Sequence, residues 1–310
     1  MKDIYIFENE QLDYLLRTGL HCIHKDYVKY FTNSPTQEIK STTPNKINYK
    51  IGIIIPNYNY EKWIDKCLTS IANQTYKNFE VIFCDDCSTD KSIEIAETFK
   101  DKINIKIISL KQKRLNGGAR NEAYLHLSDD VDYVWYVDSD DWLKENKALE
   151  KINNYLQGSP DVLFVGIGVD RNGIEYGEYI PRYIDRYEAI KGWSGSCGKV
   201  IKKELATRQD CLYQEGTLKE DRTQHYKICI KMKSFKVLPE ILYIWNRNNT
   251  NSVSTKRNTV DWQVSTVRNY ADALELYGKE KGKDSKMDVI LAERVANCKN
   301  ELDTGGDSQL

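Results

Sequence analysis

What this chain lacks excludes several classes of protein. Its 310 residues contain no apolar run long enough to cross a bilayer, and Met1–Phe7 lacks the apolar stretch of a signal peptide. We therefore expect a cytoplasmic protein with no integral membrane association. The 45 basic and 46 acidic side chains nearly cancel. Without a broad basic field, nucleic acid is not the expected partner.

The chain also lacks a zinc or disulfide pattern. Its eight cysteines are scattered, which in a chain of this length favours free thiols over a disulfide framework. Cys84 and Cys87 form one close pair, which leaves a redox or zinc role open. No second cysteine pair completes a zinc site, and the four histidines are dispersed. The first predicted strand is not followed by G-x-G-x-x-G, which argues against a dinucleotide-binding dehydrogenase.

A cluster of carboxylates follows an apolar run near the middle of the chain. Tyr133–Val137 is strand-like and leads directly into Asp138, Ser139, Asp140 and Asp141. Adjacent carboxylates repel one another unless a cation lies between them, and oxygen ligands suit Mg²⁺ or Mn²⁺. The cluster therefore predicts metal-assisted chemistry on a phosphate-bearing substrate. The alternative is a solvated acidic turn.

Strand-like and helix-like segments alternate before this cluster. The predicted strands are Ile51–Pro56, Phe79–Cys84, Ile103–Leu110 and Tyr133–Val137, and the predicted helices are Glu61–Asn73, Ser92–Phe99 and Ala119–Leu127. This alternation is typical of βαβ units with a parallel sheet. Since parallel strands end at one edge, Asn57–Tyr60, Asp85–Ser88 and Asp138–Asp141 are expected to lie together there.

The remaining chain gives fewer signals. The predicted elements are helices Ala148–Leu156 and Glu220–Lys231, a strand Asp161–Gly166, two short strands in Phe235–Trp245 around Pro239, and long helices in Val260–Asp303 interrupted at Gly278–Lys283. Leu12, Leu15, Leu16 and Leu20 have helical spacing, and Thr32–Asn48 reads as a linker. We expect an N-terminal helical extension with its linker over 1–48, a main domain over 49–255, and C-terminal helices over 256–310 that cover the sheet, bind an acceptor or form oligomer contacts.

Seven segments in a fixed order carry a family resemblance. They are Ile53–Asn59, Ser70–Tyr76 with Phe79–Ile82, Asp85–Asp90, Asn116–Asn121, Val137–Trp142, Glu220–Asp221 and Arg247–Ser254. Together they resemble the family 2 glycosyltransferases, which use a nucleotide sugar. The resemblance implies the GT-A fold, a Rossmann-like, mainly parallel sheet flanked by helices. Two departures are visible: Cys87 stands at a usual glycine, and the segment before Arg120 is shortened.

The resemblance implies a nucleotide site along the first strands. Pro56 would fix the strand exit, Tyr58 would stack on or edge the base, and Asp86 would accept a hydrogen bond from it, with uracil the usual base. Arg120, placed at a helix start, would contact ribose or diphosphate. The alternatives are that Tyr58 is packing, that Asp86 caps the helix after Thr89, and that Arg120 pairs with a surface acid.

The acidic motifs would carry the chemistry. The resemblance implies that Asp138 contacts ribose or metal, that Asp140 ligates Mn²⁺ or Mg²⁺, and that Ser139 and Asp141 contact the donor. Asp221 would be the general base of an inverting displacement. Glu220 is a further candidate for a sugar contact, although it should point away from Asp221 on a helix. The alternative for both is an acidic first turn that favours the helix dipole. His225, one turn later, is expected to be structural.

A loop of small residues, Trp193–Lys199, precedes a predicted basic helix. Trp193 could stack on a sugar or anchor the core. We expect a metal-dependent inverting glycosyltransferase that uses a UDP-sugar, with a saccharide, lipid-linked, protein or modified-nucleobase acceptor. The alternatives are a non-catalytic nucleotide-sugar-binding protein on the same fold and a nucleotidyltransferase. The last is disfavoured because the turn Asn57–Tyr60 has no glycine.

Overall fold

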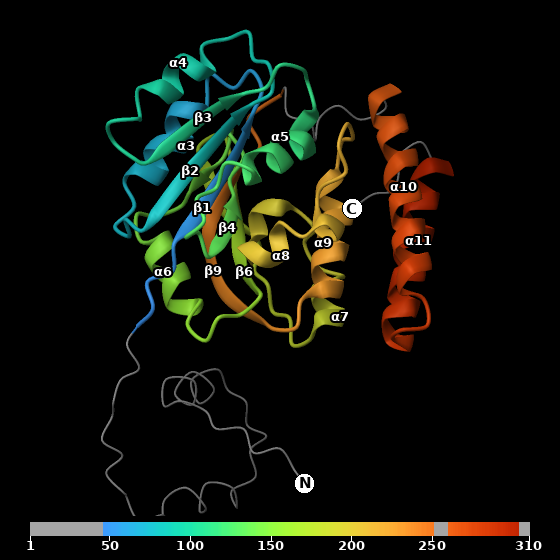
Figure 1. Ribbon diagram of the computed structural model, residues 1–310. Helices are drawn as coiled ribbons and strands as arrows, with labels where there is room; N and C mark the ends of the chain where they lie inside the picture. The colour runs from blue at the N-terminus through green and yellow to red at the C-terminus, as the bar shows by residue number, and fades with distance from the viewer. Residues whose placement is uncertain (1–45, 251–259, 304–310) are drawn as a thin grey trace, which may run out of the picture. The chain divides into compact units, whose positions relative to one another are not determined.

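The computed structural model describes residues 46–250 and 260–303. One mixed sheet forms the centre of this part of the chain, in the strand order β3-β2-β1-β4-β8-β6-β9-β5, with β7 paired to β6 (Figure 1). The strands are β1 Ile51–Asn57, β2 Phe79–Asp85, β3 Ile105–Ser109, β4 Tyr133–Tyr136, β5 Trp142–Leu143, β6 Val162–Arg171, β7 Ile174–Tyr179, β8 Lys199–Lys202 and β9 Phe235–Asn246. β1 to β4 are mutually parallel, and β8 runs antiparallel to both of its neighbours. The predicted fold class is confirmed.

Helices cover both faces of this sheet. They are α3 Ile64–Ala72, α4 Ser92–Glu97, α5 Leu115–Tyr124, α6 Ala148–Tyr155, α7 Arg186–Ala189, α8 Lys203–Ala206, α9 Glu220–Lys231, α10 Val260–Glu280 and α11 Ser285–Asp303. In β1, Ile53 and Ile55 belong to the same buried cluster as residues of α3 and α6, whereas Ile54 belongs to the cluster on the other face, with residues of α5 and α9. Because β1 is buried on both faces, it reads as a continuous apolar run in the sequence.

The predicted pair of strands around Pro239 is wrong, because β9 is a single strand. Its pairing with β6 is parallel and shifts register on either side of Gly166. The shift leaves Pro239 and Glu240 without partners in the ladder, which a β-bulge permits. A side chain on Gly166 would lie 2.6 Å from the carbonyl oxygen of Glu240. The bulge therefore depends on a glycine in the neighbouring strand.

Two predicted boundaries also need correction. The basic helix expected directly after the loop Trp193–Lys199 is preceded by strand β8 and is reduced to the short helix α8, since the β-branched Val200 and Ile201 bury on opposite faces of the sheet. Helix α5 begins at Leu115 and not at Ala119. Gly117 is a weak helix former, but its lack of a side chain allows the backbone of Gln214 to approach to 2.7 Å from the position of a Cβ atom.

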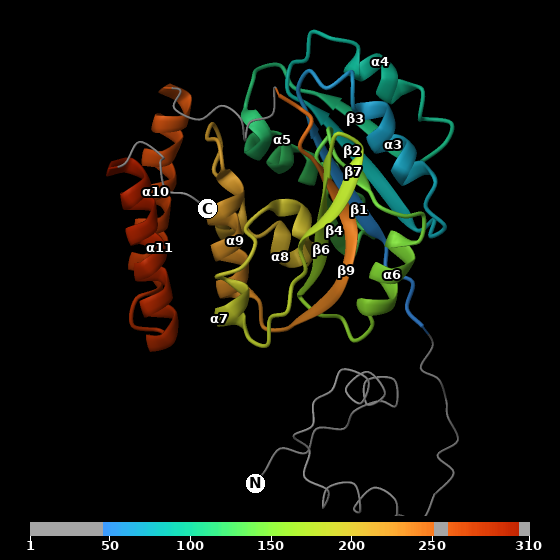
Figure 2. The same cartoon turned by 180° about the vertical axis from the view of Figure 1, so that it is seen from behind.

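Helix α9 has the predicted bounds. The break between α10 and α11 spans residues 281–284 and overlaps the predicted interruption at Gly278–Lys283, although α10 continues through Gly278 to Glu280. Both views show α10 and α11 side by side next to α9 (Figures 1 and 2). The seven cysteines in the described ranges are free, as expected. No helix in those ranges has the length and apolarity needed to cross a membrane. The predicted N-terminal helix, most of its linker and Ser252–Ser254 lie outside the described residues.

Candidate active site

The three loops expected at one edge of the sheet do meet there. Asn57, at the end of β1, donates its side-chain amide to Asp85 at 2.8 Å and to Ser88 at 3.1 Å. The hydroxyl of Ser139 donates to the carbonyl oxygen of Pro56 at 2.6 Å. These bonds join the carboxyl ends of β1, β2 and β4. This is the edge at which open α/β sheets bind ligands.

Asp86 caps a helix, although not the one expected. Its two carboxylate oxygens accept from the backbone N–H groups of Arg114 at 2.6 Å and Leu115 at 2.8 Å. Asp86 thus binds the N-terminus of α5, while Asp90 accepts from the N–H of Ser92 at the start of α4. Burial raises the pKa of Asp86, against these two hydrogen bonds. Recognition of the base by Asp86 stays a prediction.

A lysine that the sequence reasoning missed lies over the predicted base-stacking side chain. The Lys113 ammonium is 3.2 Å from the centre of the Tyr58 ring, which is a cation–π contact. Its charge also lowers the pKa of Asp86 in part. Lys113 therefore lies close to both side chains between which the base was predicted to bind.

Left-handed backbone conformations surround this edge. Non-glycine residues with positive φ include Asn59 at 58°, Cys87 at 66°, Leu115 at 60° and Lys219 at 61°. Each such residue costs on the order of 1–3 kcal/mol unless its surroundings compensate. The sequence signalled this at Cys87, which stands at a usual glycine. The Cys87 thiol also donates to the carbonyl oxygen of Leu110 at 3.2 Å.

Arg120 joins the two acidic motifs. It lies in the middle of α5, and not at a helix start, and is 3% exposed. One guanidinium nitrogen donates to Asp138 at 2.7 Å, and the other donates to Glu220. The guanidinium also lies 5.1 Å from the Tyr213 ring. Neither acid is a freely exposed surface group, so Arg120 connects the end of β4 to the first turn of α9.

Asp138 and Asp140 are the members of the acidic turn that suit a cation. The Asp138 side chain is 35% exposed. Asp140 is 7% exposed and accepts from the Asn249 amide at 2.7 Å. Burial raises the pKa of Asp140 to about 7 against that hydrogen bond, and the Asp138 charge adds to the rise. A cation between the two would favour their ionised forms.

Asp141 is buried and faces strand β9. Its carboxylate accepts from the Tyr243 hydroxyl and, at 2.8 Å, from the backbone N–H of Asn246, both in β9. Burial, followed by the charges of Asp140 and Asp138, raises its pKa well above the usual value. A donor contact by Asp141 stays a prediction and would require these bonds to change.

The first turn of α9 presents its two acids differently. Glu220 is 4% exposed and turns to Arg120, whereas Asp221 is partly exposed and lies next to it. Burial raises the pKa of Glu220, partly offset by Arg120. His225 is fully buried, with Nε2 3.1 Å from the carbonyl oxygen of Ala189. Burial lowers its pKa well below the usual value, which fits the predicted structural role.

Trp193 packs in a group of aromatic rings against the core. Its ring lies 5.5 Å from that of Trp245 and 5.8 Å from that of Tyr179. Buried Lys199 donates to the carbonyl oxygens of Ser194 at 2.9 Å and Gly195 at 2.6 Å, and burial lowers its pKa to about 8. The ring contacts with Trp245 and Tyr179 support the core-anchor alternative for Trp193, and stacking on a sugar stays a prediction.

The carboxylates of the site suit a metal ion whose remaining ligands come from the substrate. Within residues 46–250 and 260–303, no group of three or more His, Cys, Asp or Glu side chains is arranged to hold a metal. Asp138 and Asp140 supply two oxygen-donor groups. Mg²⁺ is commonly bound by one or two carboxylates together with substrate phosphates. The pair fits that mode and not a closed structural site.

Comparison with known proteins agrees with this geometry. Residues 52–212, more than half of the chain, match the model of "Glycosyl transferase family 2". The chain is 32% identical over 128 residues to the poly(ribitol-phosphate) beta-N-acetylglucosaminyltransferase TarS of Staphylococcus aureus, covering 40% of this chain and 22% of TarS. It is 28% identical over 155 residues to WfgD of Escherichia coli, a UDP-Glc:alpha-D-GlcNAc-diphosphoundecaprenol beta-1,3-glucosyltransferase, covering 50% of this chain and 60% of WfgD.

A solved structure shares the fold. TarS 1–349 in complex with UDP-GlcNAc superposes with a TM-score of 0.63 at 24% identity, covering 73% of this chain and 66% of that one. This chain thus spans only part of the length of each relative. The family match, the motif order and the shared edge agree, and the chain belongs to the family 2 glycosyltransferases.

Proposed function

We propose that this protein is a metal-dependent, inverting glycosyltransferase that transfers a sugar from a UDP-sugar to an acceptor nucleophile. The observation that carries the proposal is the Arg120 bridge. It brings Asp138, at the end of β4, and Glu220, next to Asp221, to a single buried guanidinium. A donor-side carboxylate and a candidate base are thereby held at one edge, as a displacement at a sugar carbon requires.

Each residue then has a defined task. Tyr58 and Asp86 bind the base, and Asp138 binds the ribose or shares the metal. Asp221, partly exposed at the start of α9, takes the proton of the acceptor as it attacks the anomeric carbon from the side opposite the diphosphate. Attack from that side inverts the anomeric centre.

Asp140 and Asp138 would hold the Mn²⁺ or Mg²⁺. When bound, the ion supplies positive charge for the departing diphosphate. The raised pKa of Asp140 supports this role, because without a cation this buried carboxylate is only about half ionised at pH 7, and a bound cation would favour its ionised form. The protein's own residues keep this carboxylate in place through Asn249.

The donor and acceptor classes are drawn from the relatives. TarS is named as an N-acetylglucosaminyltransferase and WfgD as a glucosyltransferase, and the TarS structure contains UDP-GlcNAc. We propose UDP-GlcNAc and UDP-Glc as the first donors to test. Poly(ribitol phosphate) and GlcNAc-diphosphoundecaprenol are the corresponding first acceptors.

The test begins with ligand binding. Melting temperatures measured with UDP, GDP and several nucleotide sugars, with and without Mn²⁺, should rise for UDP or one UDP-sugar only when the metal is present. The stabilised donor is then incubated with each acceptor and UDP release is measured. If none of the nucleotides or nucleotide sugars raises the melting temperature in any condition, the donor assignment is contradicted.

Asp221→Asn tests the base. We expect the rate of sugar transfer to fall by about 10²–10⁴-fold, since this is the usual contribution of a positioned general base. Donor binding should not change, because Asp221 does not contact the nucleotide in this proposal. Normal turnover in this variant would remove Asp221 from the mechanism.

A further inference from the structure

The segment that leads into the acidic turn of α9 is held by α10. The N–H of Leu218 donates to the Ser265 hydroxyl at 2.8 Å, and the Asn269 amide donates to the carbonyl oxygen of Leu218 at 2.9 Å. Arg268 donates to the carbonyl oxygen of Gly216 at 3.0 Å. Both backbone groups of Leu218, two residues before Glu220, are thus bonded to side chains of α10.

One carboxylate of α11 holds the residues on either side of the acidic pair. Glu301 accepts from Arg222 at 2.7 Å and from Lys219 at 3.4 Å. The Glu301 side chain is 15% exposed, so water and salt screen these contacts less than they would at the surface. The Lys219 ammonium also lies 3.7 Å from the Trp262 ring of α10. Glu220 and Asp221 therefore lie between two residues that are tied to the C-terminal helices.

The start of α9 needs such outside support. Its N-cap residue, Lys219, has a left-handed backbone and forms no capping hydrogen bond through its side chain. The next two residues are adjacent acids, one of them buried. An uncapped helix start typically frays. The contacts from α10 and α11 hold the chain on both sides of this turn.

We propose that the helix pair α10–α11 is a positioning element of the active site, with Glu301 fixing the first turn of α9 and thereby the side chain of Asp221. The pair lies beyond residues 52–212, the part that matches the family. Glu301 touches none of the reacting groups, so it is a positioning residue and not a catalytic one. This inference rests on the proposed role of Asp221.

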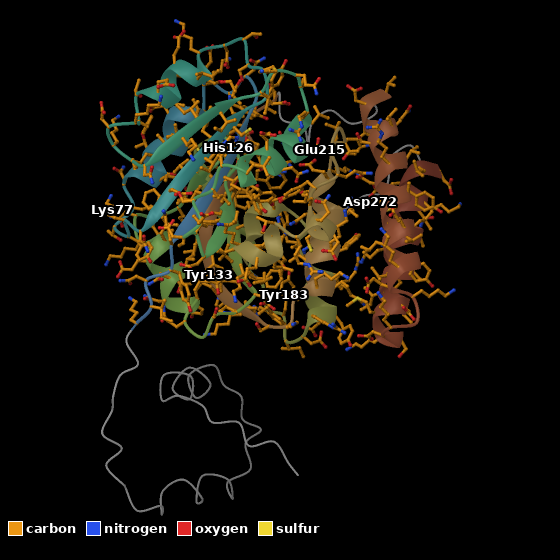
Figure 3. The ribbon with its side chains drawn as sticks, viewed as in Figure 1. Lys77, His126, Tyr133, Tyr183, Glu215 and Asp272 are labelled. Atoms are coloured by element: carbon orange, nitrogen blue, oxygen red, sulfur yellow. The ribbon has the colours of Figure 1, made fainter. Side chains whose placement is uncertain are left out.

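The opposite end of α9 provides a matched control. Lys231 pairs with Glu280 of α10 at 3.0 Å, and Lys227 pairs at 3.2 Å with Asp272, which is labelled in Figure 3. The side chain of Glu280 is 11% exposed, close to the value for Glu301. Glu280→Gln removes an ion pair between the same groups of helices, but at the C-terminal end of α9, far along the helix from Asp221.

The experiment compares Glu301→Gln with Glu280→Gln. For Glu301→Gln we expect kcat to fall about 10- to 100-fold, because small misplacements of a catalytic group have effects of that size. The KM for the donor and the binding of UDP with Mn²⁺ should stay unchanged. Glu280→Gln should keep the wild-type kcat, and Glu301→Asp should recover part of the loss. Activity is measured with whichever acceptor supports UDP release in the test above. If neither does, it is measured as hydrolysis of UDP-GlcNAc by water.

Hydrogen exchange tests the same claim without activity. Peptides covering residues 214–222 should exchange faster in Glu301→Gln and in Ser265→Ala, but not in Glu280→Gln. Wild-type kcat in Glu301→Gln overturns the inference, as does an equal loss of donor binding and kcat in both glutamine variants, which would indicate general destabilisation. If Asp221→Asn proves fully active, the proposed base is wrong, and the exchange result still decides whether Glu301 fixes this turn.

Discussion

The two sides of the candidate site differ in how far apart their parts lie along the chain. On the donor side, the turns after β1, β2 and β4 come from Asn57 to Asp141, and each follows directly from its strand. On the side of α9, the residues around Glu220 and Asp221 are bonded to Ser265, Asn269 and Glu301, which follow them by some 45 to 80 residues. The donor side is therefore built by strand order, whereas the other side is built by helix packing.

Arg120 is the connection between these sides. Its guanidinium is buried with an acid from each, so neither acid can be moved without affecting the other. The difference teaches that a family's sequence motifs can be local while the placement of its candidate base is not. Four changes, ordered by expected effect, test this distinction.

Asp140→Asn should have the largest effect and should be confined to the donor side. We expect complete loss of metal-dependent turnover and of metal-dependent UDP binding, because the carboxylate that would ligate the cation is removed. The metal-free protein should become more stable near pH 7.5, by on the order of 1 kcal/mol or more, since a buried charge is eliminated. Turnover and thermal unfolding measure the two effects. A wild-type rate would remove the metal assignment.

Arg120→Met should disturb both sides at once. The variant leaves Asp138 and Glu220 without their shared cation, which in buried sites costs about 3–5 kcal/mol. Denaturant unfolding measures the loss. Arg114→Met is the matched control, because Arg114 pairs with Glu122 and Glu215 nearer the surface (Glu215 is labelled in Figure 3) and should cost about 1 kcal/mol or less. Equal losses in the two variants would contradict the bridging role of Arg120.

Proton uptake by Asp140 should make metal binding pH-dependent. Because its pKa is about 7, protons compete with the cation below that pH, and the affinity for Mn²⁺ with UDP should fall up to about tenfold per pH unit. The raised pKa also implies that this group stabilises the metal-free fold below about pH 4, and that this contribution is lost as pH rises through 7. Calorimetric titrations between pH 5 and 8 measure the first effect. An affinity independent of pH would contradict it.

Cys87→Gly should have the smallest effect. Glycine adopts positive φ without the steric cost of a Cβ atom, so the variant should gain up to about 1 kcal/mol in the free energy of unfolding. Loss of the thiol hydrogen bond to Leu110 opposes part of that gain. Chemical denaturation provides the measurement, and Cys84→Ala, in the interior of the sheet, is a thiol-removing control that should be destabilising. A destabilised Cys87→Gly would contradict the expected net gain from relieving the positive φ.

The sequence determined strands β1 to β4, the carboxylate turn and the shared edge, because buried parallel strands are continuous apolar runs and their loops follow at fixed places. It also located α9 and the break before α11 through helical periodicity. It did not reveal the contacts of Asp86 with α5, of Asp141 with β9 or of Lys113 with Tyr58. No spacing rule pairs residues so distant along the chain.

Only the tertiary structure decided which acids are buried, and hence which pKa values are raised. It also decided that strand β8 replaces a helix at Val200 and Ile201, since a place between β4 and β6 outweighs the local preference of a short basic segment. The partners of Arg120 and Glu301 follow from the same cause. Neighbouring residues along the chain determine local structure, whereas the counter-charge of a buried group depends on which element packs beside it.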